Sequence, residues 1–140
     1  MPRIEREAQV VWEGNVARGS GRITASSGAF GDLPYTMATR VGAPEGKTSP
    51  EELLAAAHAG CLTMSIASEL SQAGTPPARL EVTARIVMDE VAGDGHQIVA
   101  SHVTVAGDQV PDEILERADA GCPFSTLLRK AGAAVTITRA

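Results

Sequence analysis

Two cysteines are the residues of this chain with the most distinctive chemistry, and they are the only two among its 140 residues. Cys61 follows His58 by three residues within a run of good helix formers, and Cys122 directly precedes Pro123. In a reducing compartment, two thiols indicate redox chemistry, a metal site or no chemistry at all. The residues around each cysteine favour redox chemistry.

The surroundings of Cys61 allow two interpretations. A spacing of three residues places His58 and Cys61 on one face of a helix. A neighbouring imidazole could help the thiol to ionise, and the thiolate is the reactive form. In the alternative, Cys61 is a small buried hydrophobic residue and His58 is a histidine with satisfied hydrogen bonds. These two residues alone leave both interpretations open.

Cys122 is predicted to occupy roughly the N-cap position of the last helix, because Pro123 suits a first helical turn. Free N–H groups and partial positive charge at a helix start favour a thiolate. The sequence Cys122-Pro-x-Ser125 is similar to one-thiol variants of redox motifs. The alternative is a cysteine that fills the corner between a helix and a turn.

A metal site is the weakest interpretation of these residues, and we expect none. It would need ligands from three separate segments, and the sequence has no paired spacing such as Cys-x-x-Cys. The residues that it would draw on are Cys61, Cys122, His58, His96 and His102.

The element that must position Cys61 is a long helix from Ser49 to about Gln72. Ser49 is the expected N-cap, Pro50 the first helical residue, and Glu52 completes a capping box. Apolar residues cover most of the circumference, which predicts a helix buried on more than one side. Polar residues interrupt its apolar run, so we expect it to fall short of a membrane span.

Strands are predicted on both sides of this helix. Residues 9–17 and 22–28 indicate two strands joined by a glycine-rich turn, followed by a loop. Strands are also expected over 80–89, where Val87 interrupts the alternation, and over 97–105, with a hairpin turn at Asp94-Gly95. Helices over 111–120 and 123–130 and a strand over 134–139 complete the chain. The order predicts an α+β fold with antiparallel sheets packed around the long central helix, in a single domain over 1–140.

Composition excludes several classes of partner. A formal net charge of -5 argues against nucleic acid or an anionic membrane as a partner, because both need clustered Lys and Arg. Aromatic residues make up only 3%, which also argues against a surface for stacking bases. The charged N-terminus has no apolar stretch behind it, so we expect a cytoplasmic protein.

Motifs along nearly the whole chain closely resemble the osmotically inducible protein C (OsmC) family, which groups with the organic hydroperoxide resistance (Ohr) proteins. The two cysteine motifs together make the resemblance highly specific. The matching segments are Trp12-Glu13-Gly14, Arg18-Gly19-x-Gly21, Pro34-Tyr35, Ala38-Thr39-Arg40, Gly46 to Leu53, Ala56 to Cys61 and Ala120 to Ser125.

The resemblance implies a thiol peroxidase that reduces organic hydroperoxides, and hydrogen peroxide as a further substrate. By position it makes Cys61 the peroxidatic cysteine and Cys122 the resolving one, with Glu51 and an arginine in the polar part of the site. Arg40 matches the OsmC branch and Arg18 the Ohr branch, and His58 stands where Ohr proteins tend to carry Tyr. The candidate substrate-binding residues are therefore Arg40, His58 and Arg18.

A cycle of this kind agrees with the chemistry of the residues. A cation lowers the pKa of the peroxidatic thiol and holds the peroxide, and a carboxylate positions that cation. The resulting sulfenic acid must be trapped by a second thiol. We expect no cofactor, and relatives suggest an external dithiol such as a lipoyl group as reductant. The alternative, from another class, is a non-catalytic binding or stress-structural protein with inert cysteines.

The resemblance also implies an intertwined homodimer, and helix geometry agrees with it. Ten residues at 1.5 Å each separate Glu51 from Cys61 by about 15 Å along a straight helix. A glutamate side chain cannot span that distance. A second copy of the helix, packed antiparallel, would bring Glu51 of one chain towards Cys61 of the other.

Overall fold

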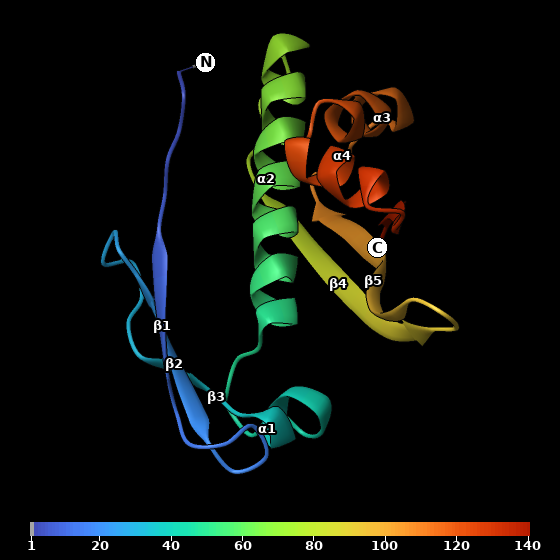
Figure 1. The fold of residues 1–140 in the computed structure, drawn as a ribbon. Helices are drawn as coiled ribbons and strands as arrows, with labels where there is room; N and C mark the ends of the chain where they lie inside the picture. The colour runs from blue at the N-terminus through green and yellow to red at the C-terminus, as the bar shows by residue number, and fades with distance from the viewer. Residues whose placement is uncertain (1) are drawn as a thin grey trace. The chain divides into compact units, whose positions relative to one another are not determined.

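The computed structural model describes residues 2–140, which form two compact units that meet in sequence at Pro50 and Glu51 (Figure 1). The expected single domain over 1–140 stays a prediction. The N-terminal unit contains β1 (Ala8–Glu13), β2 (Ser20–Ala25), β3 (Leu33–Tyr35) and α1 (Met37–Val41). The remaining elements are α2 (Pro50–Gln72), β4 (Leu80–Val91), β5 (Gly95–Gly107), α3 (Asp112–Ala120), α4 (Pro123–Lys130) and β6 (Ala134–Arg139).

The N-terminal unit is an antiparallel sheet in the order β1-β2-β3, followed by the short helix α1. The rings of Trp12 and Tyr35 lie 5.6 Å apart, and Gly21 between them on β2 has no room for a Cβ atom. A glycine is therefore required for the two rings to approach the strand. The two predicted strands are present, although β1 ends at Glu13, before the Gly14-Asn15 turn.

β3 and α1 were not predicted from the sequence, which indicated only a loop after Thr36. β3 has only three residues and carries Pro34, which an edge strand tolerates because its outward side needs no N–H donor. Thr36 caps α1 through a reciprocal pair of hydrogen bonds with Thr39. Thr39 replaces the Glu or Gln that usually completes a capping box, so the sequence lacks the usual sign of a helix start.

The C-terminal unit packs α2 against a sheet in the order β4-β5-β6. Leu62, Ile66 and Leu70 of α2 join Val103 and Val105 of β5 in its core. By length and composition α2 is long and apolar enough to cross a membrane, which corrects our expectation, but the core helix of a soluble protein passes the same test. Its buried residues, His58, Leu62, Ile66 and Leu70, form one stripe, so the expected burial on more than one side is wrong.

Pairing within this sheet corrects one part of the predicted fold. β4 and β5 form the expected antiparallel hairpin, whereas β5 and β6 run parallel. α3 and α4 connect these two strands, and parallel neighbours need a crossover connection of this kind. The hairpin register shifts between Val87 and Met88, which is where Val87 interrupts the alternation in the sequence. A bulge moves the following side chains to the other face of the strand.

Candidate active site

Cys61 and Cys122 meet inside the C-terminal unit. Cys61 lies in the middle of α2 and is partly buried, and Cys122 lies just before α4 and is fully buried. Both are free thiols, and Cys122 lies close enough to raise the pKa of the Cys61 thiol. The fold thus brings the two predicted redox residues into direct contact.

The first turn of α4 lies against Cys61. Cys122 has the extended backbone of an N-cap and Pro123 is the first helical residue, as the sequence predicts. The backbone N–H of Phe124 acts as a donor towards Cys61 and lowers the pKa of that thiol. This N–H is one of those that a helix start leaves without a partner in its own helix. We expected the helix start to favour a thiolate at Cys122, but this N–H group acts on Cys61.

Other influences on Cys61 act in the opposite direction and prevail. Burial raises the pKa of the Cys61 thiol above its ordinary 9.0, and the hydrogen bond with Cys122 and repulsion between the two thiolates raise it further. All of these influences come from the C-terminal unit itself. The Cys61 thiol is therefore mainly protonated at neutral pH in this arrangement, and a reactive thiolate needs a cation beside it.

His58 is fully buried and connects three elements. Its Nδ1 lies 2.7 Å from Oγ of Ser101 on β5, and its Nε2 lies 2.7 Å from Oγ of Ser125 on α4. Both serines are also fully buried. His58 thus has satisfied hydrogen bonds, which is the second of the two interpretations that the sequence left open. Ser101 carries no signal in the sequence beyond a polar residue in a strand, whereas Ser125 belongs to the Cys122 motif.

The charged side chains that act on His58 lie on α3 and α4. Burial lowers the pKa of His58 below 6.5, Asp119 of α3 raises it and Arg129 of α4 lowers it. Asp119 Oδ2 accepts a hydrogen bond of 2.6 Å from Arg129. Because burial is the largest influence, the imidazole is neutral at neutral pH.

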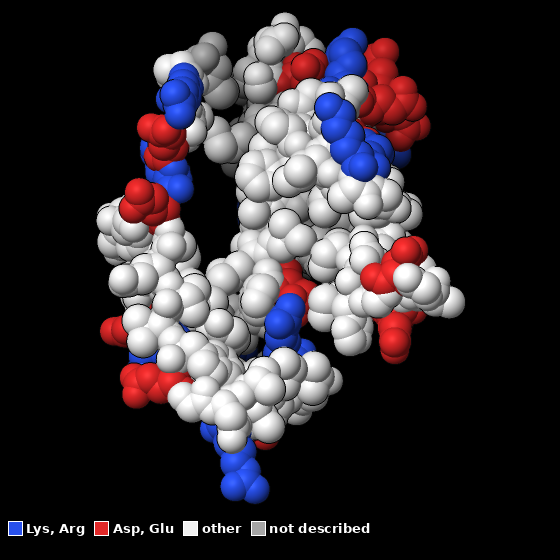
Figure 2. All heavy atoms as spheres, in the orientation of Figure 1, with Lys and Arg blue, Asp and Glu red and all other residues white. Residues whose placement is uncertain are grey.

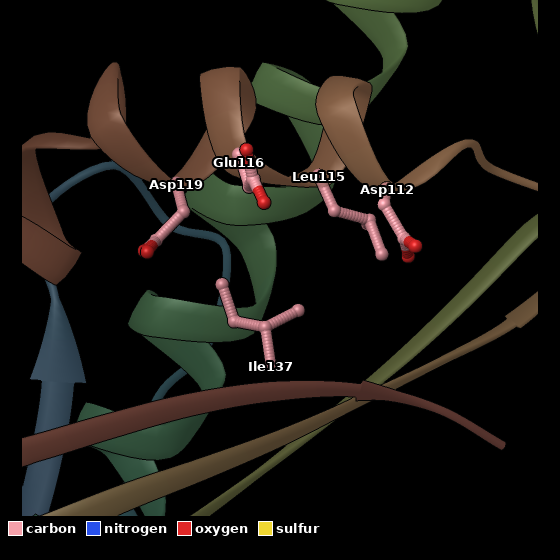
Figure 3. Close-up of a pocket in the computed structure, with 5 residues that line it drawn as sticks. All are labelled: Asp112, Leu115, Glu116, Asp119 and Ile137. Carbon is pink, nitrogen blue, oxygen red and sulfur yellow. The ribbon is translucent and has the colours of Figure 1, made fainter.

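Acidic side chains gather over α3, as Figure 2 shows. Three of them, with Leu115 and Ile137, line a pocket of about 220 Å³ between α3 and β6. In Figure 3, the side chains of Asp112, Leu115 and Asp119 point towards β6, from which Ile137 points back. Within residues 2–140, no group of three His, Cys, Asp or Glu residues is arranged to hold a metal ion.

The predicted carboxylate, Glu51, lies at the start of α2. The helix runs unbroken from Pro50 to Gln72, so about 15 Å of helix axis separates Glu51 from Cys61. The helix therefore has no break that would bring Glu51 close to the Cys61 thiol of its own chain.

Both candidate arginines belong to the N-terminal unit. Arg40 lies on α1 and lines a pocket of about 300 Å³ with the side chains of Trp12, Val16, Tyr35, Thr36 and Met37. Arg18 lies in the turn after β1 and is exposed, and its backbone N–H donates to Oδ1 of Asn15. Of the two candidates, Arg40 is therefore the arginine that lines a pocket together with apolar and aromatic residues.

Comparison with known proteins places this chain in a family. A family model described as OsmC-like protein matches residues 42–138. Peroxiredoxin OsmC of Escherichia coli (strain K12) is 38% identical over 131 residues, which cover 90% of this chain and 91% of that protein.

Solved structures agree on the fold. The organic hydroperoxide resistance protein OhrB of Bacillus subtilis superposes with a TM-score of 0.75 at 22% identity, covering 96% of this chain and 98% of that one. The organic hydroperoxide resistance protein OsmC of Legionella pneumophila gives a TM-score of 0.73 at 20% identity, covering 100% and 99%. The family model and the identity to Peroxiredoxin OsmC show that this chain belongs to the OsmC family.

Proposed function

We propose that this protein is a cysteine-based peroxidase of the OsmC type that reduces organic hydroperoxides to alcohols. Membership of the family and the identity to a protein named peroxiredoxin support the peroxidase activity. The names of the Ohr structures support the hydroperoxide substrate. The observation that carries the proposal is the close approach of two free thiols, one partly exposed and one buried.

In the first step, the Cys61 sulfur attacks one oxygen of the hydroperoxide. An S–O bond forms, the O–O bond breaks, and the second oxygen leaves with a proton as the alcohol. Cys61 is thereby oxidised to a sulfenic acid. The N–H of Phe124 is in place to stabilise the thiolate that begins this step.

In the second step, the Cys122 sulfur attacks the sulfenic sulfur of Cys61. An S–S bond forms, and the hydroxyl group leaves as water with the proton of the Cys122 thiol. The contact between the two thiols favours this closure without a large movement of the chain. An external dithiol, for which a lipoyl group is our candidate, then reduces the disulfide by exchange and becomes a disulfide itself.

We further propose Arg40 as the cation that the Cys61 thiol requires, with Glu51 positioning it and Arg18 as the alternative. Burial raises the pKa of the thiol, so a guanidinium is needed to restore the thiolate. The pocket around Arg40 combines that charge with apolar and aromatic side chains, a combination that suits a hydroperoxide with an organic group.

A homodimer is the assembly that this site favours. The unbroken α2 keeps Glu51 about 15 Å from Cys61 of its own chain. The same helix exposes apolar side chains, and Met64 is 76% exposed. An antiparallel second copy of α2 would cover such residues and supply Glu51 to the opposite thiol. We place the protein in the cytoplasm, where its thiols are kept reduced.

Turnover with a dithiol tests this function. The protein should consume cumene hydroperoxide continuously with dihydrolipoamide, whereas a variant with both cysteines replaced by serine should match the buffer. Equal consumption by the two proteins would favour the alternative, a binding or stress-structural protein with inert cysteines.

A further inference from the structure

We propose, on the basis of the peroxidase function above, that His58 is a positioning residue that holds α4 in place through Ser125 and thereby keeps Cys122 ready to trap the Cys61 sulfenic acid. His58 lies on α2, the helix that carries Cys61, and Ser125 lies on α4, which begins at Cys122. The 2.7 Å bond between Nε2 and Oγ joins these two helices.

Two adjacent residues of α4 contact two residues of α2 that are one helical turn apart. The N–H of Phe124 lowers the pKa of Cys61, and the Ser125 hydroxyl bonds to His58. Residues three apart on a helix lie on the same face, so the two interactions lie side by side. Together they fix the first turn of α4 along α2. Only the bond to His58 is made by side chains, so it can be removed by substitution.

A residue of β5 also holds the imidazole ring of His58 in position. Ser101 bonds to Nδ1 at 2.7 Å, so each ring nitrogen has one hydroxyl partner. A neutral imidazole has one donor and one acceptor nitrogen, and a hydroxyl group can serve either. Because His58 and both serines are 0% exposed, water does not replace a lost partner easily. Burial also lowers the pKa of His58, in keeping with a neutral ring.

The consequence for the reaction lies in the second step. Cys122 must attack before a second hydroperoxide oxidises the sulfenic acid to sulfinic acid, which does not re-enter the cycle. If α4 loses its bond to His58, Cys122 spends less time in contact with Cys61. Closure should then slow and over-oxidation should increase.

The test compares Ser125→Ala with Ser101→Ala as a matched control. Each variant removes one buried hydroxyl from the same ring, but only Ser125 belongs to the helix of Cys122. After rapid mixing with cumene hydroperoxide, Ser125→Ala should close the disulfide about tenfold more slowly, the loss expected for one buried hydrogen bond. Ser101→Ala should stay within about threefold of the wild type, in keeping with a bond that does not reach α4.

A second measurement needs no hydroperoxide and thus separates this inference from the proposed function. Cys122 is 0% exposed, so an aromatic disulfide reagent reaches it only when α4 opens. In a Cys61→Ser background, Ser125→Ala should speed labelling of Cys122 more than Ser101→Ala does. Wild-type protein that forms no disulfide refutes the peroxidase, whereas equal closure and equal labelling in the two serine variants refute the role of His58.

If Ser125→Ala does not fold, two substitutions of His58 take its place. A Gln amide reaches roughly the position of Nε2, and an Asn amide roughly that of Nδ1. His58→Gln should retain fast closure through Ser125, and His58→Asn should lose it. The reverse order, or the same slow closure in both variants, would overturn the proposal.

Discussion

The backbone N–H of Phe124, in the first turn of α4, lowers the pKa of the Cys61 thiol on α2. The helix that begins at the buried cysteine thus acts on the partly exposed one. In this arrangement a single helix start supplies both a donor for the Cys61 thiolate and the thiol that attacks its sulfenic acid. The two roles are linked by the chain itself, since only Pro123 separates Cys122 from Phe124.

The two cysteines should respond differently to replacement. Cys61→Ser should abolish reduction of hydroperoxide, because a serine hydroxyl is neither ionised nor nucleophilic enough at neutral pH. Cys122→Ser should allow one turnover and then stall or over-oxidise, because no second thiol traps the sulfenic acid. Single-turnover and multiple-turnover assays with a dithiol distinguish these results. Normal multiple turnover by Cys122→Ser, with monothiols excluded, would refute the assigned roles.

Replacement of the arginines should identify the cation. Arg40→Ala should raise the pKa of the Cys61 thiol and slow peroxide reduction, with about tenfold less thiolate for each pKa unit. Arg18→Ala is the matched control, since it removes the same charge from the turn after β1. Rates of alkylation as a function of pH measure the shift. Greater damage from Arg18→Ala would mean that the protein uses the Ohr arrangement.

Subunit mixing should reveal whether the site is shared. Homodimers of Glu51→Ala and homodimers of Cys61→Ser should each be inactive, because both of their active sites carry the substitution. In a mixed dimer with Glu51 acting on the opposite thiol, one site carries both lesions and the other carries neither. Part of the activity should therefore return after subunit exchange. If exchange is confirmed by mass and activity stays absent, Glu51 acts within its own chain.

Stability should fall in mild acid because of His58. Burial lowers its pKa below 6.5 in the folded state, so below that pH the unfolded chain binds more protons. Its contribution is fully present above pH 6.5 and is lost as the pH falls below it, by at most about 1.4 kcal/mol per pH unit. Urea unfolding at pH 7.5, 6.5 and 5.5 should show this decline, and His58→Asn should flatten it. Parallel declines in both proteins would assign the effect to other groups.

Strong local signals made much of the fold predictable. The Ser-Pro-Glu-Glu start predicts the beginning of α2, and alternating residues identify β4, whose one exception, Val87, lies at the register shift. Cys122 and Pro123 mark the start of α4, where the structure has it. These features depend on residues close together in the chain, which is why a single sequence reveals them.

Features that depend on distant residues were not predictable in this way. α3 and α4 determine the direction in which the chain returns to the sheet, and therefore the parallel pairing of β6 with β5. No residue type within β6 indicates this direction. The bond between His58 and Ser101 joins residues 43 positions apart, so nothing near Ser101 indicates its partner. The N–H of Phe124 belongs to the backbone and has no side-chain signature at all.

The most direct test of the central claim is the mass of the protein after one equivalent of cumene hydroperoxide. The fully reduced chain should lose two hydrogens, and peptide mapping without a reductant should yield one linked pair that contains Cys61 and Cys122. The Cys122→Ser variant should instead gain one oxygen at Cys61. An unchanged mass of the wild-type protein, or oxidation that leaves both thiols free to alkylation, would contradict the claim that this thiol pair reduces hydroperoxides.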